Sequence, residues 1–101
     1  MALDLYAGDR HEAIGKQDEF LLQLADADPA KYPQLGAIWA RLYDGPRLSA
    51  EQAGLVVHEL IDLLAEHGGT SSPALARVAL RLMSFFSVAH RAGLEIRGHS
   101  D

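Results

Sequence analysis

The stretch "SAEQAGLVVHELIDLLAEH", residues 49–67, carries the clearest secondary-structure signal in the chain. Ser49, followed three residues later by Gln52, matches the capping box that opens many α-helices. At about 100° per residue, the apolar side chains gather on one side of such a helix and the polar ones on the other. The apolar side comprises Ala53, Val56, Val57, Leu60, Ile61 and Leu64. We therefore predict an amphipathic helix over 49–67 that packs one side into a core.

Turn-forming residues separate two shorter helical segments from this one. Over about 10–27, Asp9 is placed to cap a helix and Glu12 stands three residues later, again in capping-box position. Over about 33–43, Pro33 suits the first position of a helix because its missing N–H would be unpaired there in any case. Both segments are predicted to be helices.

A fourth helix is predicted over about 73–92. Ser72 is a suitable cap, Pro73 a suitable first residue, and Gly93 a suitable stop. Its polar side chains form a narrow strip, and the rest of the circumference is apolar, which is typical of a central, buried helix.

The two ends of the chain show a different periodicity. "LDLY" at 3–6 and "LEIR" at 94–97 alternate apolar and polar residues, as short strands do. Paired with each other, they would place Asp4 opposite Arg97; ordinary coil is the alternative. The predicted fold class is all-α: a single helical domain over 1–101, forming a compact four-helix bundle with short loops, with or without a two-stranded clasp of the terminal segments.

Composition restricts the possible functions. The 101 residues include no cysteine, so disulfides, thiolate zinc sites and a cysteine nucleophile are excluded. The N-terminus lacks the basic and apolar regions of a secretory signal, and arginines interrupt the most apolar stretch. We expect a cytoplasmic protein without a membrane partner. Abundant alanine and arginine are typical of a GC-rich bacterial source.

Charge is distributed unevenly around the net value of −5. Residues 48–67 carry acidic side chains and no lysine or arginine, whereas 68–93 carry three arginines and no acid. Such asymmetry favours a basic partner for the acidic segment and argues against nucleic acid as a partner.

The segment "HELIDLLAEH", residues 58–67, superficially resembles a metalloprotease helix. His58 and His67 are nine residues apart, however, so they face opposite sides of a regular helix and cannot share one ion. His58, Asp62 and Glu66 share a side, but a solvated polar face explains that spacing equally well. We predict no catalytic residues, no metal, no cofactor and no enzymatic activity. His90, within the apolar arc of the fourth helix, is interpreted as a hydrogen-bonded core histidine.

Leu55 is the residue that the solvated-face interpretation leaves unexplained. It lies in the middle of the polar side of the 49–67 helix, surrounded by acids. An apolar anchor within a charged rim is how many protein interfaces are organised. The predicted partner-binding residues are Glu51, Leu55, His58, Glu59, Asp62 and Glu66.

The segments "DEFLLQLADAD" at 18–28 and "LSAEQAGLVVHELIDLLAEH" at 48–67 resemble those of small acidic immunity proteins, such as the four-helix inhibitors of nuclease colicins. That family carries a tyrosine-tyrosine-proline element at its binding helix. The nearest match here is "KYP", with Tyr32 and Pro33 before a different helix, so no binding residue is transferred. The resemblance implies an inhibitor that occludes a basic toxin or effector.

A second hypothesis comes from a different class of protein. Trp39, Tyr43 and the exposed part of the fourth helix would suit a self-associating scaffold or a regulatory subunit of a larger complex. The protein is accordingly expected to be a monomer under the first hypothesis and a homodimer under the second.

Overall fold

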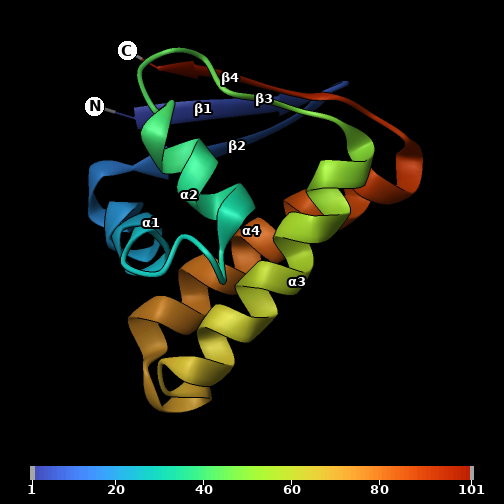
Figure 1. The fold of residues 1–101 in the computed structure, drawn as a ribbon. Helices are drawn as coiled ribbons and strands as arrows, with labels where there is room; N and C mark the ends of the chain where they lie inside the picture. The colour runs from blue at the N-terminus through green and yellow to red at the C-terminus, as the bar shows by residue number, and fades with distance from the viewer. Residues whose placement is uncertain (1, 101) are drawn as a thin grey trace.

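Within residues 2–100, the range that the computed structural model describes, four α-helices accompany a four-stranded antiparallel sheet (Figure 1). The sheet has the strand order β2-β1-β4-β3. The strands are β1 (Ala2–Ala7), β2 (Arg10–Gly15), β3 (Arg47–Leu48) and β4 (Ile96–Ser100). The helices are α1 (Glu19–Asp26), α2 (Pro33–Ala40), α3 (Ala50–Glu66) and α4 (Pro73–Ala92), with 3₁₀ turns at Lys16–Asp18 and Gly69–Ser71. The side chains of Ala2 and Thr70 are not described.

The helices all lie on one side of the sheet, and the other side carries no helix (Figure 1). α3 and α4 form a long antiparallel hairpin, which is the most extensive contact between helices. α1 and α2 pack against each other, and α2 also touches α3. The core lies between the inner face of the sheet and the helices. Its largest fully buried side chains include Leu3, Leu5, Ile14, Leu21, Leu22, Tyr32, Leu35, Ile38, Leu60, Leu63, Leu75 and Phe86.

The all-α prediction is wrong because residues 10–15 form a strand and not the first turns of a helix. β1 and β2 pair from Ala2–Gly15 to Ala7–Arg10, which leaves Gly8 and Asp9 as a two-residue hairpin loop. Gly8 has φ of 59°, and glycine at the first position is what a type II′ turn requires. Asp9 therefore belongs to a turn. The capping-box interpretation of Asp9 and Glu12 was the source of the error.

The remaining helices lie closer to their predicted ranges. The predicted 10–27 helix is reduced to α1, and the predicted 33–43 helix ends at Ala40. α3 lies one residue inside 49–67 at each end, and α4 coincides with 73–92. At the start of α3, Gln52 N donates to Ser49 Oγ over 3.1 Å and Ser49 N to Gln52 Oε1 over 2.8 Å. The capping box predicted there is present.

The two ends of the chain do pair, but the C-terminal strand covers Ile96–Ser100 and not the predicted 94–97, and the register differs from the expected one. β1 and β4 are adjacent and antiparallel, with Tyr6 opposite Arg97 and Asp4 opposite His99. Asp4 and Arg97 are therefore not partners. β2 and β3 extend this pair to a full sheet, which the terminal alternation alone does not reveal.

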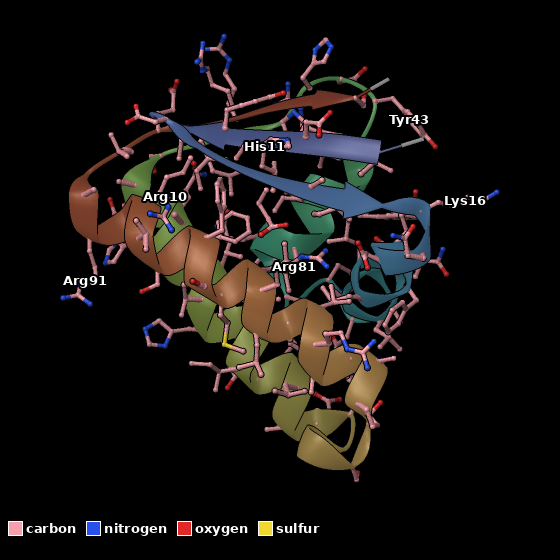
Figure 2. The ribbon with its side chains drawn as sticks, turned by 180° about the vertical axis from the view of Figure 1, so that it is seen from behind. Arg10, His11, Lys16, Tyr43, Arg81 and Arg91 are labelled. Atoms are coloured by element: carbon pink, nitrogen blue, oxygen red, sulfur yellow. The ribbon has the colours of Figure 1, made fainter. Side chains whose placement is uncertain are left out.

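An ion cluster ties α4 to β2 and the start of α1. Arg81 Nη2 lies 2.8 Å from Asp18 Oδ2 and donates to the carbonyl of Ala13 over 3.1 Å. Arg81 Nε lies 2.9 Å from Glu12 Oε2, close enough for an ion pair but not aligned for a hydrogen bond. In Figure 2 the Arg81 side chain points from α4 into the space beneath the sheet. Asp18 is buried, so its contact with Arg81 links α4 to the segment between β2 and α1 in the interior of the protein.

No helix within residues 2–100 is both long enough and apolar enough to cross a lipid bilayer.

Candidate partner-binding groove

α3 is turned about its axis relative to the orientation predicted from its apolar side. Ile61, predicted to face the core, is 48% exposed, whereas Glu59, predicted to face solvent, is only 8% exposed. The reason is that α3 has two neighbours, α4 along its length and α2 on the Glu59 side. The spacing of apolar residues along α3 indicates one buried side, but it does not reveal that α2 covers a second side.

Glu59 caps the first turn of α2. Its Oε1 accepts hydrogen bonds from the backbone N–H groups of Gln34 and Leu35, each over 3.0 Å, and its Oε2 lies 3.0 Å from Gln34 N. Tyr32, the residue before α2, provides no side-chain cap, so these N–H groups have no partner within their own helix. Burial raises the pKa of Glu59, and the two backbone donors oppose that rise. Glu59 is a structural capping residue and does not lie on an exposed acidic face.

Glu66, the last residue of α3, is bound by two side chains that precede α2. Tyr32 Oη donates to Glu66 Oε2 over 2.6 Å, and Lys31 Nζ forms an ion pair with the same oxygen. The bonds from Lys31 and Tyr32 lower the pKa of Glu66. Burial and the neighbouring carboxylate together raise the pKa of the Tyr32 phenol. Glu66 remains exposed, but part of its charge is neutralised by Lys31.

Four of the six predicted binding residues remain exposed without being committed to such a contact. Glu51, Leu55, His58 and Asp62 all lie on the solvent side of α3. Leu55 is 47% exposed, a large fraction for an apolar side chain of its size. Of the six residues predicted to bind a partner, Glu59 alone is buried; the other five are exposed, with Glu66 at the end of α3.

A groove runs along the seam between α3 and α4 and brings three of these residues together. It has a volume of about 250 Å³. α3 contributes one wall, and α4 contributes the other through Ser87 and His90. The full lining is Glu51, Gly54, Leu55, Val57, His58, Ser87 and His90. Asp62 and Glu66 lie further along α3, outside the groove.

His90 shapes the α4 wall of the groove. Its Nδ1 lies 2.7 Å from the backbone carbonyl oxygen of Ala50. A carbonyl accepts only, so Nδ1 is the donor in this contact and Nε2 faces away from it. The ring sits against Gly54, where a Cβ would come within 2.7 Å of it. The bare backbone of Gly54 therefore lets α4 place an imidazole directly against α3.

The groove combines an apolar lining with few polar groups of defined orientation. Leu55, Val57 and the bare Gly54 backbone supply apolar surface, while Glu51 supplies a fixed negative charge. Within the described residues, Ser87 makes no hydrogen bond to His58 or His90. Its polar atoms are placed to bind a basic or hydrogen-bonding group beside an apolar side chain.

Sequence reasoning missed Gly54, Ser87 and His90 as lining residues. His90 was expected in the core; instead it is exposed, although its ring does have a hydrogen-bond partner. The sequence does contain one indication of the groove: Gly54, a glycine in the interior of the predicted helix. Such a glycine often marks a close approach. Among the described residues, no three histidine, aspartate or glutamate side chains converge as a metal site would require.

No protein-family model matches the chain, and no curated protein or solved structure is significantly similar to it.

Proposed function

We propose that the protein is a binding module that inhibits a basic partner protein, with the α3–α4 groove as its docking site. One observation carries the proposal: Glu51, Leu55 and His58, assigned to a partner-binding face from the sequence, line the groove together with residues of α4. The sequence pattern and the cavity thus point to the same exposed part of α3.

The partner segment that suits this groove pairs an apolar side chain with a basic one. Leu55 and Val57 offer apolar contact, and Glu51 and Asp62 place negative charge within and beyond the groove. The net charge of −5 attracts a basic protein at long range and raises its rate of association. Apolar contact in the groove then slows dissociation, which is where most affinity differences arise.

The proposed mechanism is stoichiometric occlusion, as the resemblance to immunity proteins implies. A rigid helical hairpin seated on a basic surface blocks access to that surface without any chemical step. α3 and α4 are well suited to this because the capping box at Ser49 and the extensive contact between the two helices hold the groove in shape. Little ordering is then required on binding.

Charge reversal tests the proposal directly. Glu51→Lys combined with Asp62→Lys should weaken binding to the product of the reading frame adjacent to this protein's gene, measured by calorimetry. The matched control is Asp26→Lys combined with Asp28→Lys, which changes the net charge equally at exposed positions away from the groove. Glu59 is unsuitable for reversal because lysine there would bury an unpaired cation against two backbone N–H groups.

A selective loss in the Glu51 and Asp62 pair supports the groove, and an equal loss in both pairs indicates long-range attraction only. Leu55→Asp provides the second readout, since it removes the apolar anchor without adding positive charge. If the neighbouring product binds all variants equally, or does not bind at all, the inhibitor proposal is wrong.

Self-association is the second candidate, and the apolar side chains outside the groove favour it. Ile61 on α3 is 48% exposed and Leu80 on α4 is 59% exposed. Tyr43, after α2, is 65% exposed. Sedimentation of the purified protein separates the two functions: a stable dimer that dissociates on Leu80→Glu supports the scaffold, and a monomer supports the inhibitor.

A further inference from the structure

The helix-free face of the sheet carries one continuous row of side chains across all four strands. Tyr6 of β1 is directly opposite His11 of β2 on one side and Arg97 of β4 on the other. Arg97 is in turn directly opposite Arg47 of β3. Directly opposed residues of an antiparallel sheet point to the same face, and all four are exposed. The row therefore reads histidine, tyrosine, arginine, arginine.

Arg47 and Arg97 face each other, and two positive charges in this arrangement repel unless an anion lies between them. Like charges directly opposite each other in a sheet are destabilising. Arg47 has one acidic partner, Glu95, at 3.7 Å, and both side chains are more than half exposed, so the pair is weak. Arg97 makes no ion pair in the described part of the chain. The acid nearest the other end of the row, Asp4, is already bound to His11 at 2.8 Å.

The arginines border a hollow of about 610 Å³ on this face. Its lining is Tyr6, Asp44, Gly45, Arg47, Arg97, Gly98 and His99. Volumes of roughly 300–1,000 Å³ are usual for small-molecule sites. One edge of the hollow is fixed, because Gly98 N donates to the carbonyl of Pro46 over 2.7 Å. A Cβ on Gly98 would lie 2.8 Å from Pro46, so the α2–β3 loop packs directly on β4.

We propose that this hollow binds a nucleoside phosphate. The phosphate would lie between Arg47 and Arg97, whose planar guanidinium groups match its oxygens in paired hydrogen bonds. The base would stack on Tyr6, which already holds one flat ring: His11 is stacked on it with centroids 4.8 Å apart and planes 25° apart. Asp44 provides an acceptor for a base N–H or a ribose hydroxyl.

The proposal is compatible with the acidic character of the whole chain. Most of the excess acid lies on α1 and α3, which are on the helical side of the sheet (Figure 1). The row belongs to the opposite face, as the strand register and the exposure of its side chains indicate. Charges on exposed surfaces are screened over about 8 Å at physiological salt. The lining of the hollow carries two arginines, Arg47 and Arg97, and one carboxylate, Asp44, which is offered to the nucleoside and not to the phosphate. The hollow suits a single nucleotide unit, either free or as part of a single strand, and not a duplex.

Titration followed by NMR tests the site on the intact protein. The probes are uridine monophosphate, adenosine monophosphate, a short single-stranded oligonucleotide, inorganic phosphate and uridine without phosphate. A nucleotide should perturb Tyr6 and Arg97 together and saturate at lower concentration than either phosphate or uridine alone. A mononucleotide that binds as tightly as the oligonucleotide identifies the free nucleotide as ligand; much tighter binding of the oligonucleotide identifies a single strand.

Matched variants make the result specific. Arg97→Ala should reduce affinity by about tenfold or more, the usual consequence of losing hydrogen bonds to a charged group. Arg10→Ala is the control for charge, since Arg10 is opposite Ala7 at the hairpin end of β2, outside the row (Figure 2). Tyr6→Ala should lower affinity by about tenfold, whereas Tyr6→Phe should retain it because stacking needs only the ring. Absence of saturable binding at millimolar nucleotide, binding unaffected by Arg97→Ala, or equal affinity for inorganic phosphate would each overturn the proposal.

Discussion

The imidazole of His90 occupies the space that a side chain at Gly54 would fill. A Cβ built on Gly54 lies 2.7 Å from the ring, and the same ring bonds to the carbonyl of Ala50, one turn earlier. A glycine in the interior of a helix costs about 0.5–1 kcal/mol relative to alanine. In α3 that cost is offset by a contact that ties the C-terminal half of α4 to the first turn of α3 and forms a wall of the groove.

Replacing Gly54 by alanine should therefore have two opposing effects. The helix gains about 0.5–1 kcal/mol, but the ring of His90 must move and loses a hydrogen bond worth about as much. We expect the free energy of unfolding to change by less than about 0.5 kcal/mol, while the NMR signals of His90 shift and partner binding in the groove weakens. Chemical denaturation and partner titration measure the two effects separately.

The control is the same substitution in a His90→Ala background. With the ring absent, Gly54→Ala meets no obstacle and should stabilise the protein by about 0.5–1 kcal/mol. The difference between the two backgrounds is the coupling energy of the pair. Identical effects in both backgrounds would mean that the ring does not depend on the glycine.

Glu59→Ala should destabilise the protein although it removes an acid from an acidic chain. The substitution leaves the N–H groups of Gln34 and Leu35 unpaired at a largely buried helix start. An unsatisfied buried donor costs about 1–3 kcal/mol. Chemical denaturation should show that loss, and Asp62→Ala, one turn away and exposed, should change stability by less than about 0.5 kcal/mol. Equal small effects from the two would contradict the capping role of Glu59.

The fold was predictable where sequence signals are local. The capping box at Ser49 and the proline at position 73 mark helix starts through features within four residues, and both helix starts were predicted correctly. The first hairpin also has a local signal, Gly8–Asp9 directly after the alternating segment 3–6, but Asp9 and Glu12 present a competing helical pattern. Tertiary pairing decides between these alternatives: β1 has neighbours on both edges, which no helix at 10–15 would provide.

The candidate site was predictable only on the exposed side of α3. Leu55 stood out as an apolar residue among acids, and it does line the groove. Glu59 looked the same as its acidic neighbours because its partner is the backbone of another helix, which leaves no trace in the spacing of side chains. The row on the sheet was equally hidden, since the opposition of Arg47 and Arg97 depends on strand register.

The stability difference between the wild type and Glu59→Gln should depend on pH. Burial raises the pKa of Glu59 in the folded state above its ordinary value of 4.5. The folded protein then binds more protons than the unfolded chain between those two pKa values, so stability falls as pH rises through that window. Glutamine does not titrate. The wild type should therefore lose stability relative to Glu59→Gln as pH rises above 4.5, with no further change once Glu59 is ionised. Denaturation midpoints from acidic to neutral pH measure this difference, and a constant difference would contradict it.

Glu66 should give the opposite dependence on pH. Its bonds from Lys31 and Tyr32 lower its pKa below 4.5 in the folded state. The stabilisation is therefore present above the unfolded pKa and is lost as pH falls through the folded pKa. The wild type should be more stable than Glu66→Gln near neutral pH, and the advantage should disappear at strongly acidic pH. Tyr32→Phe removes one donor and should reduce the advantage. An advantage that grows on acidification would contradict the assignment.

Arg81→Met should loosen the junction between the sheet and the helices. Methionine preserves much of the apolar stem, so the loss isolates the guanidinium and its contacts with Asp18, Glu12 and the carbonyl of Ala13. Breaking a fully buried pair costs about 3–5 kcal/mol, but the Arg81 side chain is 38% exposed, which screens the charge and reduces the expected loss to about 1–3 kcal/mol. Amide hydrogen exchange should accelerate in β2 and at the start of α1 before it does in the α3–α4 hairpin. Arg77→Met, on the same helix and exposed, is the matched control. If Arg77→Met destabilises as much as Arg81→Met, charge on α4 in general, and not the bond to Asp18, holds this junction.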